Sequence, residues 1–410
     1  MIRIAPQPWM TAEPSRRIFE ALGAARFIGG CVRDAVAGRP VADIDIATPL
    51  LPEAVMARLK AAGIRAVPTG LAHGTVTAAF NGTTTEITTL RRDVACDGRH
   101  AEVAFTDDWL ADAARRDLTI NALSCTADGT LYDPFGGVAD LTAGRVRFIG
   151  RAEHRIREDV LRLLRFFRFY GRYSRPPPDD EALAACRALA PLLPGLSGER
   201  VRAELFRLLV QDRCAEVWAL MVATAVMPHL VPAALRVDRL AALVRLEADL
   251  GLGPAEDRVV VRFAALLATN RAGAEAVAER LRLSRAERDR LLGLVAPTAP
   301  PHPTDPPARL RRTLVTLGNG DRFRDLVLLA AAATPDIPES APKALMPVLA
   351  LAERWAATRF PVSGRDLLAH GVPAGPAVGQ RLAELEAWWA EQDFRPDREA
   401  CLVELERRWA

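Results

Sequence analysis

Hydrophobic and polar residues alternate in the first part of the chain, in the pattern that predicts β-strands. Thr75 to Phe80 and Thr84 to Leu90 place apolar residues between threonines or charged residues, with the two-residue period of a half-buried strand. Asn81-Gly82 between them predicts a hairpin turn. Three shorter apolar runs also predict strands, and the last is expected to close the same sheet: residues 26–28, 44–47 and 146–149.

Helical spacing accompanies these strands and then dominates the chain. Residues 16–23 and 52–62 predict two helices that each end at a glycine. After about residue 150 no convincing strand pattern follows, and apolar residues recur at helical intervals in successive segments: 153–172, 181–190, 199–210 and 213–225. A proline-dense break at 297–307 separates later helical stretches. We therefore expect an α+β protein, with a small α/β head followed by an all-α remainder.

Charge and cysteine usage narrow the class of protein without selecting a function. The 410 residues contain 54 Lys and Arg against 51 Asp and Glu, so any contact with a nucleic acid must come from local basic patches. Six cysteines occur without a CxxC pair, which indicates free thiols. The sequence contains no long uncharged apolar run, so we expect a cytoplasmic protein with no membrane contact. No protein partner is evident.

Gly29-Gly30 lies between a predicted strand and a predicted helix. The missing side chains would let the backbone approach a phosphate, and the N–H groups of the following helix would then face that anion. Arg33, three residues further along, adds a cation at the same helix start. An ordinary tight turn is the alternative interpretation of this pair alone.

Asp43 and Asp45 are separated by one residue on a predicted strand, so both carboxylates are expected on the same face. Two carboxylates this close repel each other unless a cation lies between them, and hard oxygen ligands suit Mg²⁺. A pair of surface aspartates is the alternative. The phosphate-type turn upstream favours the metal site, and with it phosphoryl or nucleotidyl transfer by two metal ions.

Two further segments carry candidate site residues. Glu86 lies on a neighbouring predicted strand, where it could supply a third carboxylate to the metal ions or could be a solvated strand-edge glutamate; the sequence leaves both open. The run from Arg115 to Leu123 begins with polar residues and continues with apolar ones, as at a helix start beneath a ligand. Arg116 is positioned there to reach a phosphate, and an ordinary salt-bridged turn is the alternative.

The segment from Glu158 to Arg168 predicts a helix with two different faces. One face is apolar and is expected in the core: Val160, Leu163, Leu164 and Phe167. The opposite face carries one acid followed by regularly spaced arginines: Asp159, Arg162, Arg165 and Arg168. A solvated charged face is the ordinary interpretation. The nearly pure arginine composition, with phenylalanines interleaved, is more typical of a surface that binds a polyanion and a planar base.

Together these motifs resemble the class II tRNA nucleotidyltransferases, the CCA-adding enzymes, and the related bacterial poly(A) polymerases. The resemblance covers about the first half of the chain in seven ordered blocks: residues 27–34, 43–48, 86–91, 115–123, 133–137, 158–162 and 198–201. The later helical half has no matching block, so only its architecture is carried over.

The resemblance implies a domain order and a set of site residues. The implied domains are a nucleotidyltransferase head, a neck with the base-reading helix, a body and a tRNA-binding tail: residues 1–150, 151–212, 213–296 and 308–410. Asp43 and Asp45 are implied to ligate Mg²⁺, with Glu86 as a further catalytic residue. The residues implied to contact the nucleotide are Gly29, Gly30, Arg33, Arg116, Asp117, Asn121, Asp159, Arg162, Arg165 and Arg168.

The implied activity is the addition of C and A residues to the 3′ end of tRNA from CTP and ATP. A carboxylate at Asp159 would accept from the exocyclic amine of C or A, and Arg162 would donate to the adjacent ring nitrogen. Polyadenylation and C-only or A-only addition use the same head chemistry and stay open, as does an inactive RNA-binding module. The C-terminal residues include no polybasic run, which favours tRNA over polyadenylation.

The segment from Arg92 to Phe105 matches the flexible loop of this family, which is linked to the switch from C to A addition. The family pattern leads us to expect an aromatic residue near the start of this loop. Ala95 and Cys96 stand there instead.

Overall fold

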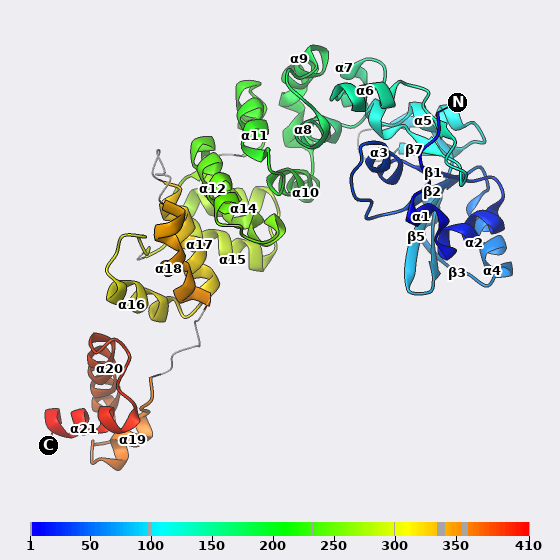
Figure 1. The fold of residues 1–410 in the computed structure, drawn as a ribbon. Helices are drawn as coiled ribbons and strands as arrows, with labels where there is room; N and C mark the ends of the chain where they lie inside the picture. Colours follow the sequence, from blue (N-terminus) through cyan, green and yellow to red (C-terminus); the bar gives the residue numbers. More distant parts are fainter. Residues whose placement is uncertain are drawn as a thin grey trace. The chain divides into compact units, whose positions relative to one another are not determined.

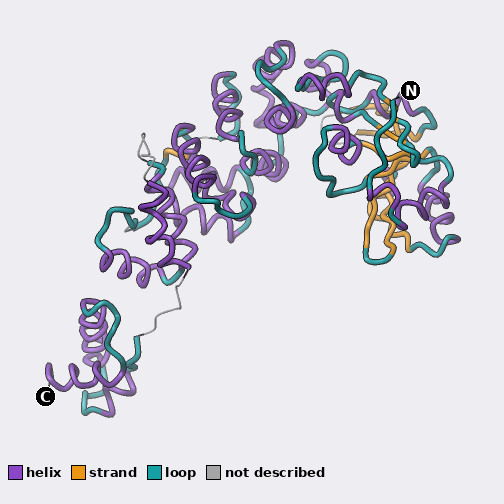
Figure 2. The backbone as a smooth tube through the Cα atoms, viewed as in Figure 1, coloured by secondary structure: helices purple, strands orange, loops and turns teal. Residues whose placement is uncertain are grey.

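The structure, a computed structural model, describes residues 2–96, 101–231, 233–298, 300–333, 341–353 and 360–409. It divides into two compact units, the first built from residues up to 232 with 280–282 and the second from 233–279 with 283–410. Figure 2 shows that the long strands gather near the N-terminus and that helices make up most of the rest. The α+β class predicted from the sequence is confirmed (Figure 1).

The first unit begins with a seven-stranded sheet in the order β3-β4-β5-β2-β1-β8-β9. Its strands are β1 (Arg26–Ile28), β2 (Asp45–Thr48), β3 (Arg65–Gly70), β4 (Thr75–Phe80), β5 (Thr83–Thr89), β8 (Ser124–Cys125) and β9 (Leu131–Tyr132). β2 and β5 pair in parallel, and the other neighbours are antiparallel. The predicted hairpin turn joins β4 to β5, and both of its residues adopt positive φ.

One strand prediction is wrong, and several strands were missed. Residues 146–149 do not close the sheet; Phe148 forms only an isolated bridge to Leu118, and its ring stacks on Phe166 at 5.7 Å. The apolar character of this run therefore reflects packing under a helix. In the first unit, the missed strands are β3, the two-residue strands β8 and β9, and a separate antiparallel pair, β6 (Arg91–Cys96) with β7 (Ala101–Phe105).

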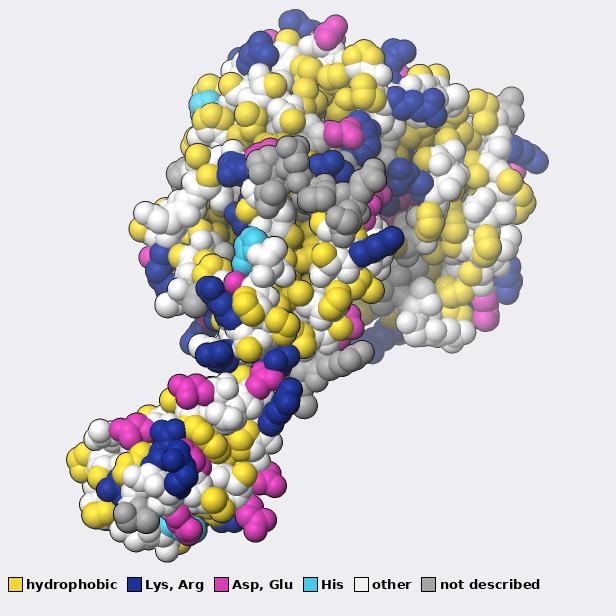
Figure 3. Space-filling model, turned by 60° about the vertical axis from the view of Figure 1, so that its left-hand side comes forward, with side chains coloured by type: hydrophobic (Ala, Val, Ile, Leu, Met, Phe, Trp, Pro, Cys, Tyr) yellow, Lys and Arg dark blue, Asp and Glu magenta, His cyan; other side chains and the backbone are white. Residues whose placement is uncertain are grey.

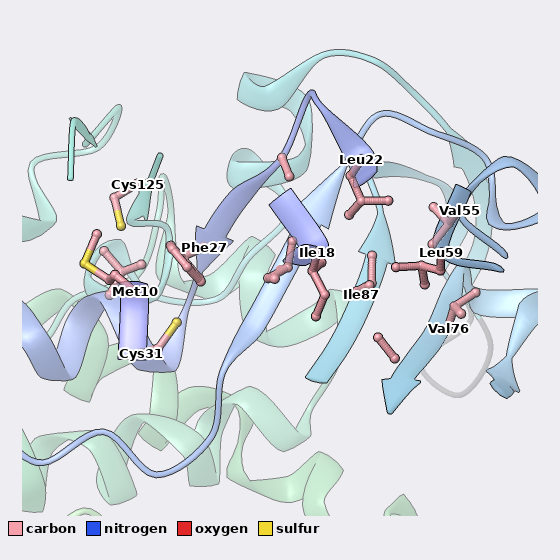
Figure 4. Close-up of a cluster of buried hydrophobic side chains, with 14 of the residues drawn as sticks. Met10, Ile18, Leu22, Phe27, Cys31, Val55, Leu59, Val76, Ile87 and Cys125 are labelled. Carbon is pink, nitrogen blue, oxygen red and sulfur yellow. The ribbon is translucent and has the colours of Figure 1, made fainter. Parts of the chain in front are cut away.

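Six helices surround the sheet within the described head: α1 (Pro8–Thr11), α2 (Glu13–Leu22), α3 (Gly30–Val36), α4 (Pro52–Ala61), α5 (Trp109–Ala114) and α6 (Gly137–Ala143). α2 and α4 pack against the sheet through one apolar cluster, in which Ile18 and Leu59 meet Phe27 and Ile87 (Figure 4). These side chains are almost fully buried, so burial of apolar surface holds β2 and β5 in fixed register.

Five helices complete the first unit: α7 (Ala152–Glu158), α8 (Leu161–Tyr173), α9 (Asp180–Leu189), α10 (Gly198–Leu209) and α11 (Cys214–Ala223). The single helix predicted over 153–172 is wrong, because the chain is extended at Asp159 (φ −150°, ψ 107°). The Asp159 side chain accepts a hydrogen bond from the Leu161 amide at 3.1 Å, which starts a new helix in place of the old one.

The second unit is built mainly from helices α12 (Val237–Asp249), α13 (Val259–Leu266), α14 (Arg271–Arg280), α15 (Arg285–Val295), α16 (Pro307–Leu317), α17 (Gly320–Ala331) and α18 (Ala341–Glu353). The predicted proline-rich break lies between α15 and α16. Two short paired strands, β10 (Ala234–Leu235) and β11 (Leu267–Ala268), are exceptions to the all-α prediction.

The chain ends in a group of three helices, which we call the C-terminal module (residues 360–409): α19 (Gly364–Ala369), α20 (Pro376–Glu391) and α21 (Arg398–Trp409). It has its own apolar cluster around Leu385 and Trp389. Across the described parts of the whole chain, every helix is too short or too polar to cross a membrane. The finer division into neck, body and tail stays a prediction.

Candidate functional site

A cavity of about 540 Å³, which we call the head cavity, opens inside the first unit. Strand residues from β1, β2, β5 and the start of β6 contribute part of its wall, and residues from α5 to α8, together with one from α10, contribute the rest. The lining residues are Ile28, Asp45, Ala47, Glu86, Thr88, Arg91, Asp112, Arg115, Arg116, Asp117, Asn121, Asp159, Leu161, Arg162, Arg165 and Arg200.

Two carboxylates lie together on the strand side of the head cavity. Asp45 on β2 is registered opposite Glu86 on β5, and residues paired in this way project to the same face of a sheet. β5 lies between β4 and β2, so Glu86 is not on a sheet edge, but its side chain is exposed; its role as a third carboxylate for the metal ions stays a prediction. The pairing places both carboxylates at the cavity wall.

The carboxylate of Asp45 carries charge that Arg116 neutralises only in part. Burial raises its pKa, the Glu86 carboxylate raises it further, Arg116 acts in the opposite direction, and Asp43 adds another upward contribution. Within the described residues no donor is found hydrogen-bonded to this carboxylate. Uncompensated negative charge made of hard oxygen donors is the environment that a divalent cation such as Mg²⁺ stabilises.

Asp43 is exposed and precedes β2, which begins at Asp45. It is not among the residues that line the head cavity, although its charge acts on Asp45. In the described part of the chain, no three His, Cys, Asp or Glu side chains converge closely enough to form a metal cluster. The donor types fit Mg²⁺, and the assignment of Asp43 as a ligand stays a prediction.

Gly29 is the residue immediately before α3 and has φ +64°, a backbone conformation that favours glycine. A Cβ atom at this position would lie 3.2 Å from the Arg116 guanidinium. Arg116 donates to the Asn121 carbonyl oxygen at 3.2 Å and to the Asp112 carboxylate at 3.3 Å. Gly29 therefore leaves room for an arginine at the cavity wall, and Gly30 begins the helix beside it.

Asp112 is a buried acid that holds this arginine in place, and its role was not predicted from the sequence. Its carboxylate accepts from the Arg115 side chain at 2.9 Å and from the Arg91 backbone amide at 3.3 Å, in addition to Arg116. Burial alone would raise its pKa, but Arg116 and Arg115 bring it below its usual range. Its spacing of three and four residues from the two arginines is the signal that could have identified it.

Asp117 is buried and saturated with hydrogen bonds. It accepts from the Leu118 amide at 2.9 Å, from the Asn121 side-chain amide at 2.9 Å and from Arg165 Nε at 2.5 Å. Burial alone would raise the pKa of this carboxyl, but Arg165, Asn121 and the Leu118 amide hold it far below its usual range. Asp117 therefore fixes Arg165 at the cavity wall.

Arg33 does not line the head cavity. It is buried, pairs with Asp34 at 3.0 Å, and lies over the Phe169 and Tyr173 rings at 5.0 and 4.6 Å. It reaches the site through Asn121, whose side-chain oxygen accepts from Arg33 at 2.7 Å. Direct contact between Arg33 and a phosphate stays a prediction, and Arg33 supports the site through Asn121.

Asp159 and Arg162 both line the head cavity, and both are held by other residues. Arg200 Nη2 donates to the two carboxylate oxygens of Asp159 at 3.0 and 2.8 Å. Arg162 donates to Glu158 at 2.5 Å and to the Arg115 carbonyl oxygen at 2.9 Å. The pair predicted to read the base is therefore fixed before any ligand binds.

The remaining arginines of the predicted stripe also have acidic partners. Arg168 pairs with the buried Glu204 at 2.6 Å and lies 4.2 Å over the Phe169 ring, outside the cavity lining. Because Arg165 pairs with Asp117 in the same way, the face is not an ordinary solvated surface. Arg200 and Glu204 orient the side chains of this face, and neither was assigned a role from the sequence. Arg200 nevertheless falls in one of the matched blocks.

The segment from Arg92 to Phe105, predicted to be a flexible loop, mostly belongs to the β6–β7 pair. Its centre, residues 97–100, lies outside the described residues. The pair joins the head cavity at Arg91, whose backbone amide donates to Asp112. The prediction of a loop over the whole segment is wrong, because backbone pairing orders its two ends.

Two sequence-family models match the chain. One, described as the Poly A polymerase head domain, covers residues 25–147, which contain β1, β2 and β5. The other, described as a probable RNA and SrmB-binding site of polymerase A, covers residues 178–236. The first model therefore includes the strand side of the head cavity and Arg116.

Named relatives extend the match over nearly the whole chain. The mitochondrial CCA tRNA nucleotidyltransferase 1 of Danio rerio is 36% identical over 394 residues, covering 93% of this chain and 86% of the relative. The corresponding protein of Homo sapiens is 34% identical over 395 residues, with the same coverage. The CCA-adding enzyme of Geobacillus thermodenitrificans is 38% identical over about half of each chain.

Solved structures show the same architecture. The Bacillus stearothermophilus CCA-adding enzyme in complex with CTP matches with a TM-score of 0.76 and 27% identity, covering 97% of this chain and 98% of that chain. The Thermotoga maritima CCA-adding enzyme complexed with tRNA matches with a TM-score of 0.65 over the full length of both chains. At 18% identity, the second match shows the fold alone.

Proposed function

The chain belongs to the family of CCA-adding tRNA nucleotidyltransferases, and on that premise we propose that it adds C and A residues to the 3′ end of tRNA from CTP and ATP. The observation that carries the proposal is the composition of the head cavity. The carboxylates of Asp45 and Glu86 lie on its strand side, and its helix side carries arginines held by the buried Asp112 and Asp117, together with Asp159. A nucleoside triphosphate needs a cation at its phosphates and a polar partner for its base.

We assign the strand side to the reacting phosphates. Asp45 and Asp43 would hold Mg²⁺, with Glu86 as an additional carboxylate beside Asp45. The bound metal would polarise the α-phosphate and stabilise the negative charge that develops during transfer. In the reaction, the RNA 3′ oxygen bonds to the α-phosphorus, the α–β phosphoanhydride bond breaks, and pyrophosphate leaves. Arg116 lines the same cavity and would hold the triphosphate in line for the attack.

We assign the helix side to the base. The Asp159 carboxylate would accept from the exocyclic amine of C or A, and Arg162 would donate to the neighbouring ring nitrogen. U and G present a carbonyl and an N–H at these positions, so both protein groups would be mispaired. Support comes from the hydrogen bonds of Arg200 and Glu158, which hold this pair in one orientation.

The test supplies purified protein with three tRNA transcripts that end before C, after one C and after CC. CTP and ATP are added singly and together in the presence of Mg²⁺. Completion to CCA, followed by arrest, is the expected result. A long run of A residues on RNA that is not tRNA would instead identify a poly(A) polymerase, and growth that stops after CC or requires CC would identify a partial enzyme.

The site assignments have their own test. Replacing Asp159 with Ala should allow UTP or GTP incorporation while CTP and ATP are still used. Unchanged discrimination between the four nucleotides in Asp159→Ala would remove its base-reading role. Arg187 on α9 is exposed, so Arg187→Ala is the matched control and should keep the selectivity of the wild type.

We also propose that the protein acts in the cytoplasm. The five cysteines whose side chains the structure describes are buried thiols outside any disulfide: Cys31, Cys125, Cys186, Cys214 and Cys401. Burial raises the pKa of Cys31 to about 11 and that of Cys125 to about 12, so these thiols stay protonated and unreactive. Localisation of a tagged chain by fluorescence microscopy and fractionation tests this compartment, and enrichment in an organelle fraction would contradict it.

A further inference from the structure

A second cavity, of about 510 Å³, lies in the second unit, where the end of α15 meets α16 and α17. We call it the α16 cavity. Its lining contains three arginines, three threonines and two apolar residues, with no carboxylate among them: Pro297, Thr298, Arg309, Arg312, Thr313, Thr316, Leu317 and Arg322. The wall therefore presents only cationic and hydroxyl groups to a polar ligand.

One face of α16 supplies half of this lining. Arg309, Arg312, Thr313 and Thr316 follow one another at intervals of three, one and three residues, so they form one stripe on the helix. The whole of α16 contains three arginines and neither Asp nor Glu. The helix is therefore a local source of positive charge in a chain that is almost neutral as a whole.

The arginines of the α16 cavity are weakly held by the protein. Arg309 lies 3.4 Å from Asp305 and is largely exposed. Among the described residues, the Arg322 side chain donates one hydrogen bond, to the Gly293 carbonyl oxygen at 3.3 Å. Among the residues that the structure describes, Arg312 has no ion pair or hydrogen bond from its side chain. Three cationic groups therefore face one cavity whose lining residues include no carboxylate, so an anionic ligand would lower their repulsion.

Gly293 on α15 has a steric role in this arrangement. A Cβ atom there would lie 2.9 to 3.1 Å from the Arg322 guanidinium, closer than unstrained carbon contacts allow. A glycine in the interior of a helix costs about 1 kcal/mol relative to alanine. The space that it leaves lets Arg322 lie along the helix at the cavity wall.

The C-terminal module has the opposite charge balance. Residues 360–409 contain six arginines, Arg365, Arg381, Arg395, Arg398, Arg407 and Arg408. They contain nine acids: Asp366, Glu384, Glu386, Glu391, Asp393, Asp397, Glu399, Glu404 and Glu406. Figure 3 shows this module at the lower left, with magenta acidic side chains at several places on its surface. A polyanion gains little electrostatic free energy there.

We propose that the α16 cavity binds phosphodiester groups of an RNA backbone and supplies much of the electrostatic affinity of the second unit for RNA. Threonine hydroxyls and guanidinium groups both donate hydrogen bonds to phosphate oxygens. The lining includes no aromatic ring or carboxylate that would read a base, which favours a sequence-independent backbone contact over a nucleotide pocket. The identity of the ligand as RNA rests on the proposed function. The electrostatic contact between the second unit and RNA is then expected at the α16 cavity and not at the C-terminal module.

The test measures equilibrium binding of a tRNA transcript without CCA to the full chain at several salt concentrations. The test variant is Arg309→Gln, Arg312→Gln, Arg322→Gln in one chain. Its matched control is Arg285→Gln, Arg365→Gln, Arg395→Gln, which removes the same charge from exposed positions of the same unit outside the cavity. Thermal unfolding of both variants verifies that each is folded.

The cavity variant should bind tRNA about ten- to a hundredfold more weakly, and the slope of log affinity against log salt should fall by about two to three. The control variant should change affinity less than about threefold. Equal losses in the two variants would overturn the proposal. Inorganic phosphate or CTP that displaces tRNA beyond its effect on ionic strength, in the wild type but not in the cavity variant, would identify a small-anion site and also overturn it.

Binding and transfer are measured separately, so the two proposals can fail separately. A wild-type chain that binds tRNA through the cavity arginines but adds no CCA would refute the proposed function alone. A cavity variant that binds as tightly as the wild type, in a preparation that completes CCA, would refute the cavity alone.

Discussion

The two cavities both use arginine, but they hold it in different ways. In the head cavity, Arg162 and Arg165 each lie 2.5 Å from a carboxylate. In the α16 cavity, Arg312 has no such partner among the described residues, and Arg309 has only a longer contact with Asp305. The chemical group is the same, and its freedom of movement differs.

This difference separates two tasks. An arginine fixed by a carboxylate has lost its rotamer freedom before the ligand arrives, so its remaining donors can discriminate between bases at a defined position. An arginine without a fixed partner keeps its charge available and can follow any phosphate, so it contributes affinity without selectivity. We therefore expect changes in the head cavity to alter rate or base choice, and changes in the α16 cavity to alter RNA affinity.

The largest expected effect comes from Asp45→Asn. Removing the carboxylate that would hold the metal should lower the rate of both C and A addition by about a thousandfold or more, since metal stabilisation of phosphoryl transfer is worth several kcal/mol. RNA affinity should stay the same. Single-turnover transfer and tRNA binding are measured on the same preparation, and Asp128→Asn, at an exposed position, is the control. A parallel loss of RNA binding in Asp45→Asn would contradict the separation of rate and affinity between the two cavities.

The next largest effect concerns stability. Asp117→Asn leaves Arg165 without its buried partner and should lower the free energy of unfolding by about 1 to 3 kcal/mol. Because folding lowers the pKa of Asp117, its contribution is present above the ordinary aspartate pKa of about 4 and is lost as the pH falls through lower values. Denaturant unfolding of the wild type and of Asp117→Asn at pH 7 and at about pH 2 to 3 checks this, and the difference between the two chains should shrink at the lower pH.

The stability comparison has a direct counterpart in the second unit. Arg312→Ala removes a side chain that lacks a buried partner. The free energy of unfolding of this variant should therefore stay within about 0.5 kcal/mol of the wild-type value. If Arg312→Ala destabilised the chain as much as Asp117→Asn does, the distinction between fixed and loosely held arginines would not stand.

A smaller effect is expected from Arg200→Ala. The bond from Arg200 to Asp159 is partly exposed, so its loss should reduce discrimination against UTP and GTP by about fivefold. The rate with CTP should change less than the selectivity does. Kinetics with all four nucleotides measure the ratio, and Arg200→Lys, which keeps a cationic donor group without the planar guanidinium, should recover part of it. Full selectivity in Arg200→Ala would show that Asp159 needs no such support.

The smallest expected effect comes from Gly293→Ala, which tests the comparison of the two cavities through the position of an arginine in the α16 cavity. The new methyl group displaces the Arg322 guanidinium, so tRNA affinity should fall about two- to fivefold. Stability should not fall, because alanine favours a helix over glycine. Gly379 on α20 faces open space, and Gly379→Ala is the matched control. Equal affinity in the two variants would mean that the position of Arg322 is unimportant.

Local motifs predicted much of the head cavity. Asp45, Glu86 and Arg116 lie in short segments whose residue types alone indicate phosphate and metal chemistry, and the structure places all three at the cavity wall. Arg200 escaped assignment because it meets Asp159 from 41 residues away in sequence, and nothing in its own segment specifies that contact. Pairing between distant segments is set by packing, which a single sequence does not display.

The fold shows the same division: elements with a clear local pattern were predicted from the sequence, and elements without one were missed. Strands with a clear two-residue alternation, such as β4 and β5, were recovered together with their turn. Two-residue strands such as β8 and β9 are too short to show any period. The break at Asp159 was missed because the residues on its two sides continue one helical repeat, so the apolar pattern alone gives no sign of the interruption.

On the proposed base-reading role of Asp159, the break between α7 and α8 bears on attempts to redesign nucleotide choice. Asp159 is held at an extended position by backbone geometry and by Arg200, so it does not occupy a place on a regular helix. A library that varies only the exposed positions of α8 would leave the direction of this carboxylate unchanged. Engineering an enzyme that accepts another base would therefore have to vary residues 158–160 and residue 200 together, so that the acceptor and its support change as one unit.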